Sequence, residues 1–448
     1  MLESEMLLAV PGAAARTASH APRLPMPPKT LLETGLEPRL VVDLVAKAIA
    51  QRGKVHVPVL GSLLRLPVSV LREVLGAMQA DGLVDTAWRG ETDLDVQYQL
   101  TAAGRQHAAA ALAACRYCGP APVTLEAYAE MLQRQSLREL PEYRIGAADM
   151  HDAFAGACLP DGVRDVIGAA MHAGRSLLLY GAPGSGKSTL ARKLGRLQKG
   201  VIAVPYALVV GSRIVQLFDP AIHIVPSCLH VRLHGERRSV DSRWALCQRP
   251  LVMIDAQLDA SAMEMRRDDT NGVMHAPAHI QANGGMLVID DLGRQRIDAG
   301  AILNRLACAS ESRFDQLAVD GGNKLQLPFD VMTVYATNLD PGTLLDKAQL
   351  RRIDYKVHIG PLPEGLYRQL FRQQCHALGI AFDETVLDYL VGCLHRRSGR
   401  PMLACHPREL LARMTELASY AGTAPRLSTA ALDQVWASMF AAPIPVED

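Results

Sequence analysis

One segment constrains the fold more than any other: an apolar stretch, a glycine-rich loop and a helical run succeed one another between residues 176 and 197. The loop reads Gly181-Ala182-Pro183-Gly184-Ser185-Gly186-Lys187-Ser188-Thr189, which is G-x-x-x-x-G-K-[ST] in the strand–loop–helix context that this pattern requires. Its glycines let backbone N–H groups converge on phosphates, and the helix N-terminus adds positive potential. We expect Lys187 to contact the β- and γ-phosphates and the Ser188 hydroxyl to bind Mg²⁺. The segment therefore predicts a nucleoside-triphosphate site.

Two further apolar stretches end in polar side chains that suit the same site. One, starting at Gly284, runs into Asp290 and Asp291, and the other, starting at Val331, runs into Asn338. Because ligands bind at the carboxyl ends of the strands in an open α/β sheet, we expect these side chains to lie beside the loop. Asp290 would bind Mg²⁺, and Asp291 would orient or deprotonate the attacking water. Asn338 would face the γ-phosphate or that water, with a simple turn as the alternative.

The remaining pattern divides the chain into five segments. At 448 residues the chain is too long for one ordinary core. Residues 1–36 lack apolar periodicity and predict a flexible tail, and residues 119–146 predict a helical connector. Residues 37–118 predict three helices, a β-ribbon and a closing helix, an α+β arrangement that resembles a winged-helix domain. Helices alternating with short apolar strands predict a parallel α/β domain over 147–360, followed by helices over 361–448.

The winged-helix-like segment raises the question of DNA binding. The predicted recognition helix carries Arg72 beside Glu73, and the predicted wing carries Glu91, Asp93 and Asp95. Contact with phosphates needs clustered Lys and Arg, because charge neutralisation dominates nonspecific affinity for DNA. A net charge of +1 also excludes a strongly basic nucleic-acid coat. The pattern therefore favours docking of a protein over contact with DNA.

Taken in order, these motifs resemble those of AAA+ ATPases. Gly181–Ser188 is similar to their Walker A motif, Met286–Asp291 to Walker B and Thr333–Asn338 to the sensor 1 strand. The stretch that begins at Asn283 is also similar to the MoxR-like and enhancer-binding branches. The nearest likeness is a group of bacterial ATPases to which chaperone activity is loosely ascribed. The resemblance, over roughly residues 145–440, implies a P-loop parallel sheet flanked by helices, a small C-terminal helical lid and hydrolysis of ATP with Mg²⁺.

The same resemblance implies roles for arginines outside the loop. The segment before the last predicted strand is similar to the one that carries the arginine finger, with Arg351 and Arg352 as alternatives. One of them would reach the γ-phosphate of a neighbouring subunit, and the other would make a structural pair. Arg408 is similar to sensor 2 and would contact nucleotide in its own subunit, with a surface ion pair as the alternative. A finger that acts between subunits implies an oligomeric ring, commonly a hexamer.

One departure from the family concerns Asp291. Most members have Asp-Glu at this point, whereas this chain has Asp290-Asp291. A carboxylate that is one methylene shorter lies farther from the water unless the backbone compensates. Three functions therefore stay open: a ring-forming ATPase that remodels or assembles a protein partner, a DNA-associated regulator or loader, and an ATP-dependent switch with little hydrolysis.

Other signals bear on location and on metal binding. The N-terminus is acidic where a secretory signal needs Lys or Arg, and no apolar run approaches the roughly 20 residues that span a bilayer. With nine cysteines, an odd number, these features predict a cytoplasmic protein without membrane insertion. Two sets of residues with metal-ligand character lack a fourth ligand or a second pair and are set aside: Cys115 with Cys118, and Cys228 with His230 and His234.

The stretch Ala207–Phe218 predicts a β-hairpin that turns at Gly211 and Ser212. Inserted hairpins of related ATPases face the pore or a partner. Cover of the sheet edge is the equal alternative.

Overall fold

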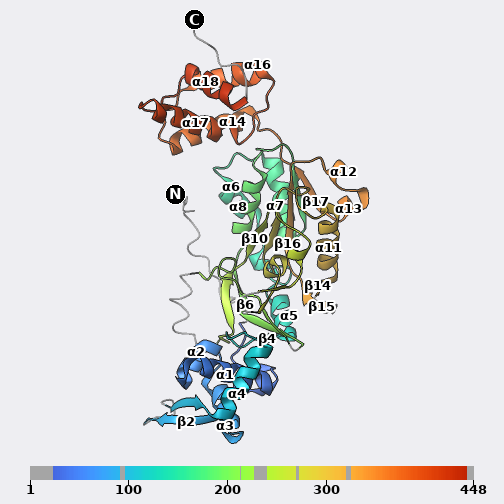
Figure 1. Cartoon of the computed structure of the whole chain (residues 1–448). Helices are drawn as coiled ribbons and strands as arrows, with labels where there is room; N and C mark the ends of the chain where they lie inside the picture. Colours follow the sequence, from blue (N-terminus) through green and yellow to red (C-terminus); the bar gives the residue numbers. More distant parts are fainter. Residues whose placement is uncertain are drawn as a thin grey trace.

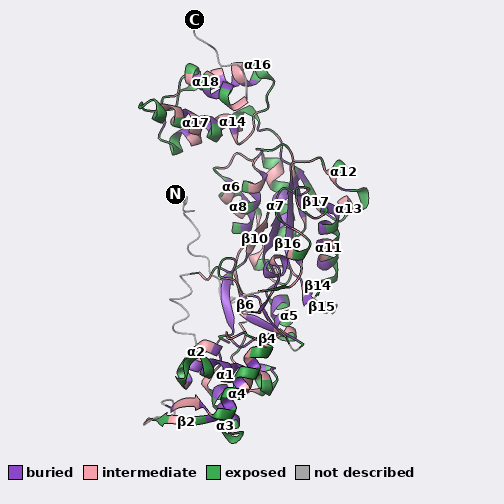
Figure 2. Ribbon diagram, in the orientation of Figure 1, coloured by how far each residue is buried: buried purple, intermediate pink, exposed green. Residues whose placement is uncertain are grey.

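The computed structural model describes residues 24–90, 96–211, 213–226, 240–268, 272–318 and 324–440. These residues form three successive parts along one long molecule: an N-terminal α+β part, a central part built on β-sheets and a C-terminal helical part (Figure 1). Buried residues lie on the inside of each part, while exposed residues lie on the outer helix faces (Figure 2). Buried residues of the last part form a cluster of their own, and the cluster of the first part also includes Ala207 and Ile214 of the central part.

The N-terminal part packs helices against a small antiparallel sheet. Its elements are α1 (Pro38–Arg52), β1 (Lys54–His56), α2 (Val57–Leu64), α3 (Val68–Ala80), β2 (Val84–Arg89), β3 (Val96–Leu100) and α4 (Ala102–Ala114). The three strands lie in the order β1-β3-β2. The helices form because apolar residues recur at helical spacing and fill one core, and the Thr101 hydroxyl caps α4 by accepting from the N–H of Gly104. The three helices, the ribbon of β2 and β3 and the closing helix follow the predicted order, whereas β1 was not predicted; Glu91, Asp93 and Asp95 of the predicted wing lie outside the described residues.

Residues 24–36 are bound to the rest of the chain, in contrast to the tail expected over residues 1–36. Leu24 packs against the central core, and the carbonyl of Pro25 accepts a 2.8 Å hydrogen bond from the N–H of Asp241. A short 3-10 helix, η1 (Leu32–Thr34), follows. Contacts that are distant in sequence fix this stretch, and periodicity does not report them. Residues 1–23 lie outside the described residues.

Residues 119–146 do more than connect. β4 (Val123–Thr124) pairs in parallel with β7 (Ala207–Val210) at the edge of a second sheet. α5 (Leu125–Arg134) follows, and its Tyr128, Met131 and Leu132 lie in the central core. The helix is confirmed, but the segment belongs structurally to the central part.

A parallel five-stranded sheet forms the centre of the molecule. Its strands are β5 (Leu177–Tyr180), β10 (Leu251–Ile254), β13 (Met286–Ile289), β16 (Met332–Thr337) and β17 (Tyr355–His358), in the order β10-β13-β16-β5-β17. Successive residues of a strand point to opposite faces. Leu177 and Leu179 therefore pack with α7 (Asp161–Ala173) and α8 (Lys187–Arg196), while Leu178 packs on the side of α11 (Ala299–Ser312). The predicted parallel sheet flanked by helices is confirmed.

Insertions decorate this sheet. A second five-stranded sheet has the order β11-β12-β8-β7-β4, and β6 (Val201–Pro205) pairs with β9 (Trp244–Gln248). The remaining inserted elements are β8 (Arg213–Gln216), β11 (Arg266–Arg267), β12 (Met274–His275), α10 (Ala278–Gln281), β14 (Phe314–Ala318) and β15 (Lys324–Pro328). β7 and β8 form the predicted hairpin, although Ser212 of its turn lies outside the described residues. Each strand of the hairpin has a further neighbour in the second sheet, β4 beside β7 and β12 beside β8. The hairpin is therefore not a free edge.

The C-terminal part is helical, as predicted, and lies beyond the carboxyl ends of the parallel strands (Figure 1). Its main elements are α14 (Glu364–Ala377), α15 (Glu384–Tyr389), a π-helical turn (Leu390–His395), α17 (His406–Tyr420) and α18 (Thr429–Phe440). Apolar residues of these helices share a core of their own. Among the described residues, no helix combines the length and apolar character that crossing a membrane requires.

Candidate functional site

The glycine-rich loop begins where β5 ends and closes at the first turn of α8, as the sequence predicts. Gly181, Gly184 and Gly186 have φ angles of 146°, 81° and 96°, which L side chains rarely adopt. A Cβ at Gly181 would lie 2.3 Å from the carbonyl oxygen of Ile359, so the close approach of β17 also requires glycine there. The loop therefore has the tight, inward-turned backbone that binds phosphates.

Lys187 occupies the first turn of α8 and points back over the loop. Its Nζ donates to the carbonyl oxygens of Gly181 (2.9 Å) and Ala182 (2.8 Å) and to the Ser185 hydroxyl (3.3 Å). Burial lowers the pKa of Lys187, and the nearby carboxylates of Asp291 and Asp290 oppose that shift. A desolvated ammonium held only by neutral oxygens is a site for an anion.

The two aspartates after β13 lie beside the loop. The Ser188 hydroxyl donates to Asp290 Oδ1 at 2.8 Å, which joins α8 to the carboxyl end of β13. Asn338, at the end of β16, donates through Nδ2 to Asp291 Oδ1 at 2.7 Å. The sequence predicts that these residues lie at one sheet edge. The structure brings Ser188, Asp290, Asp291 and Asn338 together there. It also shows that the amide of Asn338 faces the Asp291 carboxylate.

Asp291 has an unusual backbone. Its φ is 51°, one of three non-glycine residues with positive φ among the described residues. Such a conformation costs on the order of 1 kcal/mol and persists only where surrounding contacts impose it. This backbone conformation sets the direction in which the Asp291 side chain leaves the chain, and the sequence does not report it.

Two side chains that sequence reasoning missed hold the turn after β13. Thr337, fully buried, donates from Oγ1 to the carbonyl of Leu292 at 2.7 Å. Gln295 spans the turn, because Nε2 donates to the carbonyl of Asp290 at 2.8 Å and Oε1 accepts from the N–H of Gly293 at 2.9 Å. Thr337 lies in the stretch that is similar to the sensor 1 strand but was assigned no role there, and Gln295 lies outside every motif, so the sequence holds no signal for either contact.

The arginine alternatives differ in their surroundings. After Asn338 the chain forms two short helices, α12 (Pro341–Leu344) and α13 (Lys347–Arg351). Arg351 is the last residue of α13, and Arg352 follows it directly. Arg352 donates to Asn304 Oδ1 at 3.2 Å and to the Cys308 sulfur at 3.6 Å, which ties it to α11. Arg351 is exposed and makes no hydrogen bond or ion pair within the described part of the chain. Neither arginine lines the cavity at the loop of the same chain.

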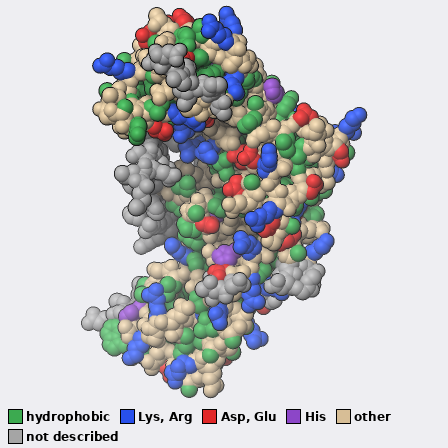
Figure 3. All heavy atoms as spheres, turned by 45° about the horizontal axis from the view of Figure 1, so that its top comes forward, with side chains coloured by type: hydrophobic (Ala, Val, Ile, Leu, Met, Phe, Trp, Pro, Cys, Tyr) green, Lys and Arg blue, Asp and Glu red, His purple; other side chains and the backbone are tan. Residues whose placement is uncertain are grey.

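A large cavity separates the loop from the C-terminal helices. Its volume is about 1440 Å³, and its walls include Ser188, Asp291, Asn338 and Arg408. In the space-filling view a hollow lies between the C-terminal part and the rest, with Lys and Arg side chains along it (Figure 3). Arg408 comes from the first turn of α17 and is exposed, as its predicted position at a helix start requires. The cavity brings the loop and Arg408 to one space.

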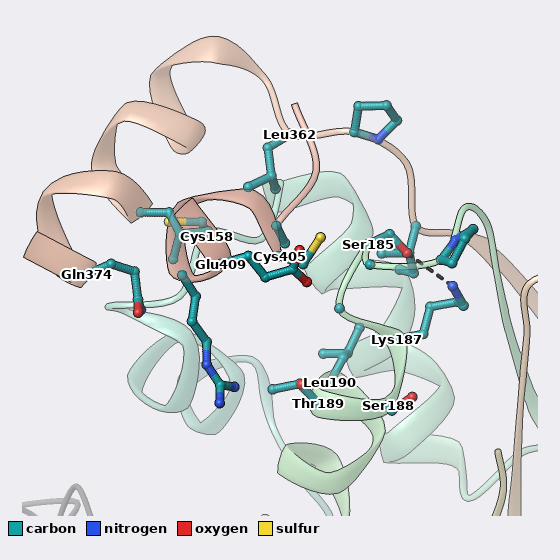
Figure 4. A pocket seen from close by; sticks show the side chains of 18 of the residues that line it. Cys158, Ser185, Lys187, Ser188, Thr189, Leu190, Leu362, Gln374, Cys405 and Glu409 are labelled. Carbon is teal, nitrogen blue, oxygen red and sulfur yellow. Dashed lines mark hydrogen bonds between the residues drawn. The ribbon is translucent and has the colours of Figure 1, made fainter. Parts of the chain in front are cut away.

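The helices also touch the loop directly. The N–H of Cys405 donates to the carbonyl of Gly184 at 3.0 Å, and a Cβ at Gly184 would lie 2.5 Å from the Cys405 sulfur. The close view shows Cys405 and Glu409 facing the cavity across from Ser185 and the start of α8 (Figure 4). The C-terminal part is thus in direct contact with the glycine-rich loop.

The donor set at the end of β13 fits a divalent cation. A serine hydroxyl and a carboxylate 2.8 Å apart are hard oxygen donors, the type that Mg²⁺ prefers. Among the described residues, no group of three or more His, Cys, Asp or Glu side chains forms a metal cluster. Cys115 and Cys118 thus lack further ligands of these types within that part, while Cys228, His230 and His234 lie outside it.

Next to Arg408, a pair of stacked histidines lies inside the C-terminal core. The rings of His406 and His395 are 5.5 Å apart, and His406 Nδ1 is buried without a hydrogen-bond partner among the described residues. The Phe440 ring packs edge-to-face against His406. The Arg400 guanidinium lies 4.0 Å from the centroid of this Phe440 ring. Burial, then His395 and Arg400, lower the pKa of His406 from 6.5 to about 4.

We expect this histidine to make the C-terminal part acid-sensitive. A lowered folded-state pKa means that unfolded chains bind a proton that the folded part rejects, so stability is full above about pH 6.5 and falls towards pH 4. The total loss is about 3 kcal/mol. Urea unfolding at pH 7.5 and 5, followed by tryptophan fluorescence, measures it. His406→Gln should reduce the difference between the two pH values; an unchanged difference would assign the effect to another group.

Comparisons with known proteins come last. A domain of unknown function (DUF8689) matches residues 363–438, the C-terminal helices. No curated protein matches the chain. Among solved structures, NtrX from Brucella abortus shares 14% identity with a TM-score of 0.39, over 68% of this chain and 59% of that one. The NtrX complex with ATP shares 14% identity with a TM-score of 0.40, over 71% of this chain and 64% of that one. The chain thus spans less than two thirds of these NtrX chains, and a likeness of this degree does not extend to function.

Proposed function

We propose that this chain is an ATP hydrolase of the AAA+ type. The observation that carries the proposal is the meeting of Lys187, Ser188, Asp290, Asp291 and Asn338 at the carboxyl edge of three neighbouring strands, β5, β16 and β13. P-loop hydrolases use such a set of groups, a phosphate-binding loop next to carboxylates and a polar side chain, to bind and cleave nucleoside triphosphates. The order of the motifs along the chain supports the AAA+ type.

Each residue has a role in this proposal. The loop amides of Gly181–Thr189 and the Lys187 ammonium bind the phosphates of ATP, and Ser188 with Asp290 holds Mg²⁺. When bound, Mg²⁺ supplies positive charge to the phosphate oxygens. Asp291 accepts the proton of the attacking water, and Asn338 fixes the Asp291 carboxylate through the 2.7 Å hydrogen bond. Arg408 contacts nucleotide from across the cavity.

A ring of identical chains and a protein client complete the proposal. Arg351 is the arginine finger, because the side chain of Arg352 is hydrogen-bonded to α11, whereas the side chain of Arg351 makes no hydrogen bond or ion pair within the described part of the chain. Arg351 does not line the cavity of its own chain, so it acts at the site of a neighbour. The bond between Cys405 and Gly184 passes the nucleotide state from loop to helical lid, and the winged-helix-like part binds the protein that is remodelled or assembled.

Binding of ATP tests the proposal directly. Purified protein with Mg²⁺ should bind ATP in isothermal titration and release phosphate. Lys187→Ala should weaken binding by about 10- to 100-fold, because a hydrogen bond to a charged group contributes roughly 1.5–3 kcal/mol. Lys199→Ala, which removes an ion pair with Asp149 outside the loop, is the matched control and should bind normally. A wild type that takes up no ATP would refute the proposal.

A further inference from the structure

The turn that follows β13 is held from both sides. On one side, the turn is hydrogen-bonded to β16. The N–H of Leu292 donates to the carbonyl of Ala336 at 2.7 Å, and Thr337 Oγ1 donates to the carbonyl of Leu292 at 2.7 Å. Leu292 and Thr337 have no exposed surface, so water does not compete for these bonds. Residue 292 is thereby fixed to its neighbouring strand by both its N–H and its C=O.

On the other side, Gln295 closes the turn. Its amide bonds the carbonyl of Asp290 and the N–H of Gly293, so it joins the residues on either side of the Asp291–Leu292 pair. The N–H of Arg294 also donates to the carbonyl of Asp291 at 2.9 Å. With residues 290, 292 and 293 fixed, the backbone between them has little freedom, and Asp291 takes φ of 51°.

This backbone determines where the carboxylate lies. Asp291 Oδ1 accepts from the Asn338 amide at 2.7 Å, and Asn338 directly follows Thr337, the last residue of β16. Thr337 and Asn338 therefore fix Asp291 at two points from consecutive residues, one through the backbone of the turn and one through the side chain. An added methylene would push the carboxylate past this amide or force the turn open.

We propose that Thr337 and Gln295 are positioning residues that hold Asp291 in its left-handed conformation, and that this conformation makes aspartate the fitting length for the acid of the site. The inference rests on the proposed hydrolysis of ATP. It adds two residues to the site and gives the Asp-Asp sequence a physical reason. Neither residue touches nucleotide; each acts through Asp291.

Turnover and binding of ATP separate this role from a general structural one. Thr337→Val and Gln295→Glu lose the donors at nearly constant size and should lower kcat about 10- to 100-fold, because small displacements of a catalytic group cost that much. The Kd for ATP, measured by titration, should stay within about twofold, since the loop is untouched. Thr337→Ser should recover most of kcat. Thr333→Val, the same change at a buried position of the same strand, is the matched control.

A separate experiment tests whether aspartate is the fitting side-chain length at position 291. Asp291→Glu should lower kcat, although glutamate is the more basic and the commoner acid. In the Thr337→Val background the turn relaxes, and the glutamate should then be tolerated, so the double variant exceeds the product of the single effects. A fully active Asp291→Glu, or strictly multiplicative effects, would overturn the inference.

Hydrogen exchange gives a readout that needs no activity. Amides of residues 290–295 should exchange faster in Thr337→Val and Gln295→Glu than in the wild type, with Thr333→Val unchanged. Equal protection in all four proteins would overturn the positioning role whether or not the protein hydrolyses ATP. A wild type that binds ATP but never releases phosphate would instead refute the proposed function, and faster exchange in the two variants would still support the positioning role.

Discussion

Replacing Arg351 by alanine should lower ATP turnover by about three orders of magnitude while ATP binding stays intact. An arginine finger stabilises the charge of the transition state and contributes roughly 10³- to 10⁵-fold to kcat. Arg351 is exposed at the end of α13 and does not line the cavity of its own chain, so its loss leaves the binding surface unchanged. Steady-state phosphate release and titration with ATP measure the two quantities.

Arg352→Ala is the matched control for Arg351→Ala. Arg352 donates to Asn304 and Cys308, so its removal should reduce stability, with a smaller effect on kcat. The reverse result, with Arg352→Ala inactive and Arg351→Ala normal, would exchange the two assignments. Normal turnover in both variants would remove the finger from this segment.

Mixing two inactive variants tests whether the finger acts between chains. Arg351→Ala chains keep a complete phosphate-binding loop, and Lys187→Ala chains keep the finger. In a ring, some sites of the mixture would combine an intact loop with an intact finger, so activity should reappear at intermediate ratios. A mixture no more active than its components would contradict a finger supplied by a neighbour.

The sequence predicted the strand, loop and helix around Lys187 because their signals are local. A buried strand, the glycine-rich loop and the first turn of α8 are contiguous, and the edge of a parallel sheet brings Asp290 and Asn338 to the loop whatever the intervening chain does. The structure confirms the strand, the loop and the helix, and it adds a hydrogen bond between Ser188 and Asp290.

Features set by distant contacts were out of reach. β10 is a short apolar run without a flanking motif, and it becomes a strand of the sheet only by pairing with β13. β4 has two residues and depends on β7, so residues 119–146 could not be assigned to the central part from periodicity. Choosing between Arg351 and Arg352 needed the position of α11, and the backbone of Asp291 needed the hydrogen bonds from β16.

Replacing Asp291 by asparagine should stop hydrolysis without preventing ATP binding. The amide keeps the size of the side chain and retains an oxygen that accepts from Asn338, but it cannot take a proton from water. Loss of a general base costs typically 10²- to 10⁴-fold, so multiple-turnover phosphate release should fall by that factor while the Kd for ATP holds.

Asp291→Asn also decides whether the chain is an enzyme or a switch. If the wild type turns over no faster than the variant, binding of ATP rather than its hydrolysis carries the function. If the wild type is faster, the variant, which binds ATP without hydrolysing it, should keep its client bound. A protein retained by Asp291→Asn with ATP, and released by the same variant with Lys187→Ala added, is then bound in the nucleotide-dependent way that remodelling requires. Retention that is equal with and without ATP would contradict it.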